Sequence, residues 1–206
     1  MRFAFVLMTA FAVSVGTASA QDTIVFGAKA GVNFSNITIE DDDTFLFGET
    51  SLRTALLVGV FGSVPVNDRI AFQPEFLFTQ KGAKLEEDGF DSTLKLDYFE
   101  IPLLADVRLN EGPTRISFIV GPALGFRSQA KVETDEEVEG VDELDLKEDV
   151  EGVDFGLVTG VAVTSGNFVV DGRYTWGLRN INKTEDEPSV KNRALSISVG
   201  WRFGRR

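Results

Sequence analysis

Apolar residues alternate with polar or small residues at period two through most of this chain. The clearest stretch is 70–81, where Ile70, Phe72, Pro74, Phe76 and Phe78 share one parity. A period of two places alternate side chains on opposite faces of a β-strand. The same alternation marks the segments 26–35, 53–64, 94–109, 115–127, 154–163, 168–179 and 194–203. The sequence therefore predicts eight strands, each with two unlike faces.

The segment 94–109 changes phase within itself. Leu94 and Leu96 share one parity, whereas the apolar residues from Phe99 onward take the other. One extra residue near Asp97 and Tyr98, a β-bulge, would return both sets to the same face. We therefore expect a bulge here, with Leu94 and Leu96 on the same apolar face as Phe99.

The connections between these strands alternate in length. The short ones, 65–68, 110–113 and 165–167, are rich in Pro, Asn, Asp, Gly and Ser, which is turn chemistry. The long ones are 36–52, 83–92, 128–152 and 182–191. This order predicts an all-β fold, an eight-stranded antiparallel up-and-down barrel with both chain ends on the short-turn side. For 128–152 we favour an extended acidic loop, and the alternative is a hairpin that turns near Gly140.

The face without the large apolar residues carries Gly, Ala and Ser together with charges of both signs. A solvated strand face has no steric reason to be small, whereas the interior of a narrow barrel does. The bases on this face are Lys29, Arg53, Lys81, Arg108, Arg115, Arg127, Arg173, Arg179 and Arg202, and the acids are Glu75, Glu100, Asp106, Asp154 and Asp171. Because an isolated buried ion is strongly disfavoured, we expect Glu75 and Glu100 to pair with inward bases.

The opposite face is apolar and carries no charge along most strands. Apolar residues outside and polar residues inside are the pattern of a transmembrane β-barrel. We therefore expect five apolar residues to face lipid: Phe72, Phe76, Phe118, Leu157 and Ile197. The alternative is a secreted soluble barrel of lipocalin type, in which the apolar face would line a pocket.

The first twenty residues have the form of a secretory signal peptide. Arg2 precedes an apolar run over 3–13, and small residues lead to Ala18, Ser19 and Ala20. The apolar run is too short to span a bilayer as a helix. We expect cleavage between Ala20 and Gln21, which leaves residues 21–206 as one barrel domain.

Several segments together resemble the PorT-like family of outer-membrane β-barrels. They are 27–36 (GAKAGVNFSN), 73–78 (QPEFLF) with 80–82 (QKG), 96–104 (LDYFEIPLL), 121–126 (GPALGF), 154–156 (DFG), 171–174 (DGRY) and 192–193 (NR). The resemblance extends over nearly all of 21–206, and it implies an eight-stranded barrel in the outer membrane of a Gram-negative envelope. The founding member serves secretion and gliding, but the resemblance implies no single function.

Composition narrows the function. The chain has no histidine and no cysteine, which excludes Ser-His-Asp triads, thiolate chemistry and the usual zinc sites. We predict no enzymatic activity, no cofactor and no dedicated metal site. A pair of catalytic carboxylates at Glu75 and Glu100 is less favoured than salt-bridged acids. The net charge of −12 argues against nucleic acid as a partner.

Most of the acidic residues lie in the four long connections, where a solvated rim is the favoured interpretation and weak divalent-cation binding the functional one. The leading function is a structural or interaction role in the envelope, with lipid around the barrel and an envelope protein bound through the long loops. The alternatives are a porin-like barrel that passes ions or small solutes and the soluble ligand-binding barrel.

Overall fold

The computed structural model describes residues 24–39, 51–87, 90–134, 143–146, 150–182 and 189–203. The predicted signal peptide and Gly140 lie outside these residues. The strands are β1 (Val25–Ile39), β2 (Ser51–Pro65), β3 (Ile70–Glu87), β4 (Phe90–Arg108), β5 (Thr114–Thr134), β6 (Glu143–Asp145), β7 (Val153–Ser165), β8 (Phe168–Gly177) and β9 (Val190–Phe203).

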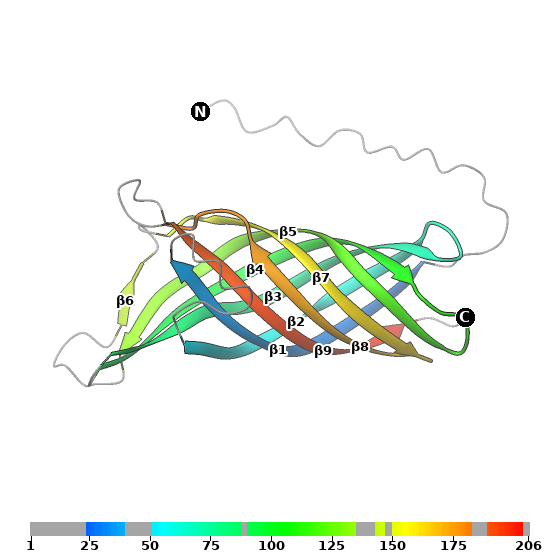
Figure 1. Ribbon diagram of the computed structural model, residues 1–206, viewed down its shortest axis with the longest axis horizontal. Helices are drawn as coiled ribbons and strands as arrows, with labels where there is room; N and C mark the ends of the chain where they lie inside the picture. The colour runs from blue at the N-terminus through cyan, green and yellow to red at the C-terminus, as the bar shows by residue number, and fades with distance from the viewer. Residues whose placement is uncertain are drawn as a thin grey trace, which may run out of the picture.

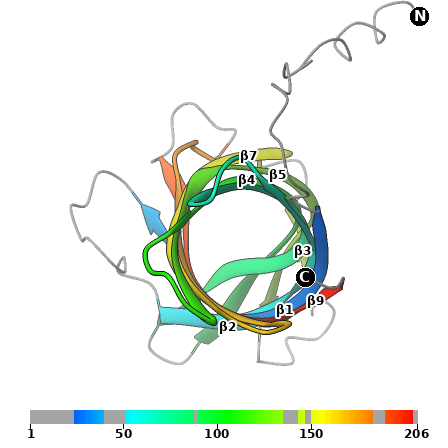
Figure 2. The same ribbon diagram turned by 90° about the vertical axis from the view of Figure 1, so that its right-hand side faces the viewer.

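Eight of these strands close into a barrel. The sheet runs in the order β4-β3-β2-β1-β9-β8-β7-β5-β6, and β4 also pairs with β5, which completes the ring and leaves β6 outside it. All of the paired strands are antiparallel. Viewed end-on, the strands form a ring (Figure 2). The predicted eight-stranded antiparallel barrel is confirmed.

The two ends of the barrel differ in their connections. The turns after β2, β4 and β7 are short and lie at the same end as the start of β1 and the end of β9, on the right of Figure 1. These turns are 66–69, 109–113 and 166–167, close to the predicted ones. Asn67 holds the first of them, because its side-chain Oδ1 accepts hydrogen bonds of 2.9 Å from the backbone N–H groups of Arg69 and Ile70.

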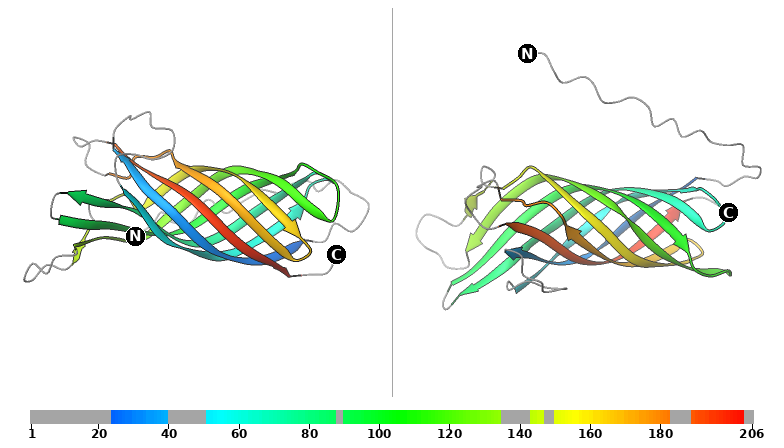
Figure 3. Two further views of the ribbon diagram at one scale, coloured as in Figure 1. Left: turned by 60° about the horizontal axis from the view of Figure 1, so that its bottom comes forward. Right: turned by 45° about the horizontal axis from the view of Figure 1, so that its top comes forward.

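At the opposite end, all four predicted loops contain strand residues, although 36–52 and 182–191 contain them only at their ends. The expectation of a loop over 83–92 is wrong, because β3 and β4 stay paired out to Glu87 and Phe90. The favoured loop over 128–152 is also partly wrong, because β5 continues to Thr134 and pairs with β6, from Lys131↔Asp145 to Glu133↔Glu143. Part of the hairpin alternative is therefore correct. These strands extend beyond their neighbours in the ring (Figure 3).

The predicted bulge is present, but its extra residue lies on the neighbouring strand. The β4–β5 register shifts between Asp97 and Tyr98, where Asp97 pairs with Gln129 and Tyr98 with Arg127, so Ser128 on β5 is skipped. The parity of β4 therefore does not change. Leu94 and Leu96 point into the barrel and are buried, and their expected place on the face of Phe99 is wrong.

Candidate functional site

The interior of the barrel contains most of the charged residues that alternate with the apolar face. Among the acids, Glu75, Glu100, Asp106, Asp154 and Asp171 are all buried. The five apolar residues at the other parity stand on the outer wall, where Phe72, Phe76, Phe118, Leu157 and Ile197 are 39–51% exposed. The wall thus separates a polar interior from an apolar exterior at these positions.

Four of the interior charges form one compact tetrad. Lys29 on β1 lies 3.0 Å from Glu75 on β3 and 2.8 Å from Asp171 on β8. Arg173 on β8 lies 2.8 Å from each of the same two carboxylates. All four side chains are at most 4% exposed. Two bases and two acids cancel, so the tetrad is neutral and every charge has two opposite neighbours.

Neutral donors complete the tetrad. Gln73 donates a hydrogen bond of 2.8 Å to Glu75, and Ser198 donates one of 2.8 Å to Asp171. The Lys29 ammonium lies 5.3 Å from the centre of the Phe61 ring, a cation–π distance. That ring fits only because Gly27 has no side chain, since a Cβ there would overlap it. This explains why a small residue alternates with the charges.

A second polar cluster lies nearer the long-loop end. The Lys81 ammonium is 2.7 Å from Glu100 and 5.4 Å from the centre of the Tyr98 ring. Asn192 on β9 donates to the Tyr98 hydroxyl at 3.2 Å and to Asp154 at 2.9 Å. Arg53 donates to the backbone carbonyl of Lys81. Tyr98, Asn192 and Gln73 were not identified from the sequence, because neutral polar residues at inward parity give no charge signal.

The remaining predicted lumen charges do not join the tetrad. Asp106 and Arg115 lie 4.0 Å apart near the short turns. Arg127 donates to the backbone carbonyl of Glu151 at 3.2 Å and is half-buried, as are Arg108 and Arg202. Arg179 was expected inside, and this is wrong. It lies beyond the end of β8, is exposed, and pairs with Glu151 at 3.3 Å.

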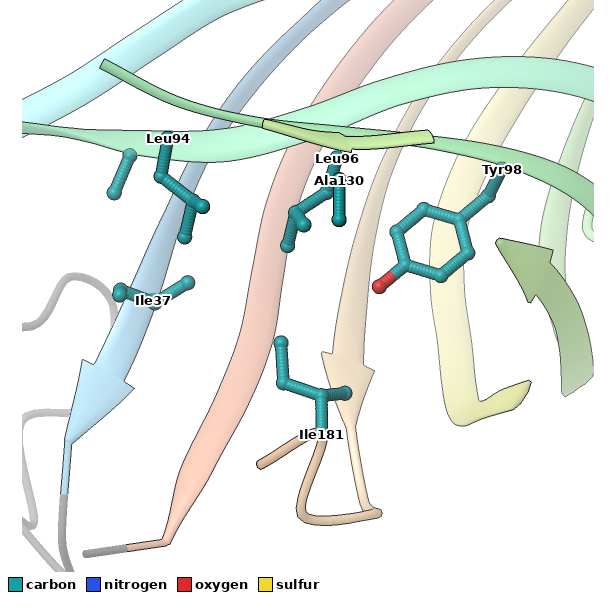
Figure 4. Packing of buried hydrophobic residues seen from close by; sticks show 7 residues of the cluster. Ile37, Leu94, Leu96, Tyr98, Ala130 and Ile181 are labelled. Atoms are coloured by element: carbon teal, nitrogen blue, oxygen red, sulfur yellow. The ribbon is translucent and has the colours of Figure 1, made fainter. Parts of the chain in front are cut away.

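Apolar residues also fill part of the interior, beside the charges that were expected there. At the long-loop end, one buried cluster contains Ile37, Ala83, Leu94, Leu96, Tyr98, Ala130 and Ile181 (Figure 4). Two smaller clusters contain Phe61, Ile119, Ala162 and Val169, and Leu104, Ala123 and Val158. A cavity of about 10 Å³, lined by Lys81, Glu100 and Arg173 among others, has room for about one water.

We expect Glu100→Ala to lower the unfolding free energy in detergent by ~2 kcal/mol, because it strands the buried Lys81 ammonium. The loss stays below that of a fully isolated ion because Asp154 also interacts electrostatically with Lys81. Glu100→Gln retains an acceptor and should lose less. Thermal unfolding followed by circular dichroism measures both. If both variants matched the unaltered protein, the Lys81–Glu100 pair would not contribute to stability.

Within the described ranges, no three or more His, Cys, Asp or Glu side chains are grouped so that they could hold a metal ion. No helix in the same ranges is both long and apolar enough to cross a membrane.

Comparison with known proteins gave one family and a set of structures. The family model described as outer membrane protein beta-barrel domain matches residues 19–183. A comparison with curated protein sequences returned no match.

Three of the similar solved structures are outer-membrane or surface proteins. Ail of Yersinia pestis, solved with the heparin analogue sucrose octasulfate, is 16% identical, with 87% of this chain and 99% of that chain covered and a TM-score of 0.48. Neisserial surface protein A is 16% identical, with 86% and 97% covered and a TM-score of 0.48. OprG from Pseudomonas aeruginosa is 12% identical, with 88% and 95% covered and a TM-score of 0.45.

Proposed function

This chain belongs to the outer membrane protein beta-barrel domain family, and from that premise we propose that it is an integral outer-membrane barrel without an open channel. Its role in the envelope is structural or consists of binding a partner through the long-loop end. The chain reaches the membrane after export and cleavage between Ala20 and Gln21. Within the family we place it in the PorT-like group, on the segments quoted above.

The outer wall supports lipid contact. Near the short-turn end, the exposed rings of Phe168 and Trp201 stack edge to face with centres 4.5 Å apart, and near the other end the half-buried Trp176 lies 4.5 Å from the buried ring of Tyr174. Phe168 and Trp176 are eight residues apart on β8. At ~3.3 Å per residue and a strand tilt of ~40°, the two aromatic groups are ~20 Å apart along the barrel axis. This separation is close to the thickness of the apolar band of outer-membrane barrels.

The observation that favours a closed barrel is the layered filling of the interior. The apolar cluster at the long-loop end, the polar cluster around Lys81, the neutral tetrad and the Phe61 cluster follow one another along the axis. An eight-stranded barrel is just narrow enough for side chains to fill it. A closed interior supports a structural or binding role over a porin-like one.

Planar-bilayer recording tests this function. We expect the purified full-length mature protein to give no stepwise conductance, while heat-modifiable migration on a gel verifies that the same sample is folded. Reproducible conductance steps from a heat-modifiable sample would establish the porin-like alternative. A protein that is recovered without detergent and shows no heat-modifiable migration would establish the soluble barrel.

The long-loop end is the proposed contact surface for an envelope protein. In the paired ends of β4 and β5 at this side, Lys95 on β4 forms an ion pair with Glu133 on β5. The excess of acid in the sequence of the long connections suits a basic partner surface or weakly held divalent cations. The proposed role is not enzymatic, since the chain lacks histidine and cysteine.

A further inference from the structure

Three prolines coincide with interruptions of the strand pairing in three consecutive seams of the barrel wall. A seam is the line of backbone pairing between two neighbouring strands. The pairing between β2 and β3 is interrupted beside Pro74, that between β3 and β4 at Pro102, and that between β4 and β5 at Pro122. The β2–β3 ladder lacks the pairs between 62–63 and 73–74. The β3–β4 ladder lacks those between 75–76 and 101–102, and the β4–β5 ladder lacks those between 103–104 and 121–122.

Each proline is regularly paired on its other side. Pro74 is opposite Leu103, Pro102 opposite Ala123, and Pro122 opposite Leu157. Because proline has no N–H, it cannot donate across the interrupted seam. The carbonyls that the register places across from the three prolines lose this donor; they belong to Gly62, Glu75 and Leu103. In hydrocarbon no water replaces the donor.

The other five seams are continuous over their described pairs. The ladders β1–β2, β1–β9, β5–β7, β7–β8 and β8–β9 advance one residue at a time without a gap. The two register shifts, between Leu52 and Leu57 and at Asp97/Tyr98, also lie on the seams β2–β3 and β4–β5. Every irregularity of the described barrel ladders therefore lies between β2 and β5, in the part of the barrel made by β2, β3, β4 and β5, which we call the β2–β5 wall.

We propose that the β2–β5 wall is a conformational device, the part of the barrel that opens locally, and that Pro74, Pro102 and Pro122 mark where it opens. Local opening requires least free energy where fewest backbone hydrogen bonds must break. The wall is also held from inside, because Glu75 lies on an interrupted seam while its carboxylate binds Lys29 on β1 and Arg173 on β8. The tetrad thus links this wall to β1 and β8 through ion pairs across the interior.

Amide hydrogen exchange of the mature protein in detergent micelles, followed by NMR, tests the proposal. We expect amides beside the prolines, in 75–78 and 100–104, to exchange about tenfold faster than amides at matched depth in β7–β9, since one or two hydrogen bonds are missing there. Uniform protection around all eight strands would overturn the proposal.

The variant Pro122→Ala restores a donor that faces the Leu103 carbonyl. The ring of Pro122 is exposed on the outer wall, so the change removes no interior contact. We expect slower exchange in 100–104 and protection of the new amide at 122. Pro113→Ala, in the exposed turn between β4 and β5, is the control and should leave exchange in 100–104 unchanged.

A protected amide at 122 without any slowing in 100–104 would mean that this seam was already closed, which also overturns the proposal. Should Pro122→Ala fail to fold, the comparison of β3–β4 with β7–β9 in the unaltered protein still decides. None of these outcomes depends on conductance. A failure of the proposed local opening can therefore be distinguished from a failure of the proposed function.

Discussion

Replacing Arg173 by methionine is expected to lower the unfolding free energy by ~3–5 kcal/mol, because it leaves buried carboxylates with too few cations. Arg173 is the tetrad residue that binds Glu75 through two nitrogens, at 2.8 and 3.2 Å, and Asp171 through a third at 2.8 Å. Methionine keeps much of the side-chain volume, so the loss is chiefly electrostatic. Equilibrium unfolding in urea from detergent or lipid vesicles measures it.

The matched control is Arg179→Met. Arg179 also pairs with a glutamate, Glu151 at 3.3 Å, but its side chain is 44% exposed. Exposed ion pairs contribute ~0–1 kcal/mol, so this variant should unfold almost as the unaltered protein does. Equal losses for Arg173→Met and Arg179→Met would contradict the idea that burial makes the tetrad important.

Phe76→Arg is expected to cost ~2–4 kcal/mol of stability in lipid, because in the proposed membrane barrel it places a charge on the lipid-facing outer wall. Phe76 is 51% exposed and stacks on Phe99 with ring centres 5.8 Å apart. Folding into lipid vesicles, followed by heat-modifiable migration across a urea series, measures the loss.

Val66→Arg is the control for this change. Val66 is also exposed, but it lies in the short turn after β2, where water is present. We expect little change there. If Phe76→Arg were as mild as Val66→Arg, the apolar face would be in contact with water and the barrel would not be in a membrane.

The strand positions could be predicted because a period of two is a local signal that each strand carries by itself. The bulge shows the limit of that signal. The change of phase in the sequence of β4 does not come from an extra residue on β4. Leu94 and Leu96 keep the inward parity and are apolar because they join the buried cluster at the long-loop end, while the skipped residue is Ser128 on β5. Leu94 and Leu96 were therefore assigned to the wrong face.

The partners within the interior could not be predicted because they depend on register. Lys29 and Glu75 are 46 residues apart, and Glu75 and Arg173 are 98 apart. Which charges meet across the lumen depends on the stagger accumulated around the whole ring, and no single strand encodes it. The strand pairing of 128–134 was missed because only Ala130 and Val132 are apolar there, which leaves the local pattern weak, whereas pairing with β4 and β6 maintains the strand.

The tetrad also has a consequence for the order of assembly. Glu75 and Lys29 come from the N-terminal half of the chain, whereas Asp171 and Arg173 come from β8, near its end. Lys29 and Glu75 can pair early, but Arg173 and Asp171 meet them only once the last strands have joined β1. In a chain whose last strands have not yet joined β1, the ions of the tetrad therefore lack some of their partners. They become fully paired only when the ring closes. The interior charges thereby favour all-or-none insertion over a stable partly inserted intermediate.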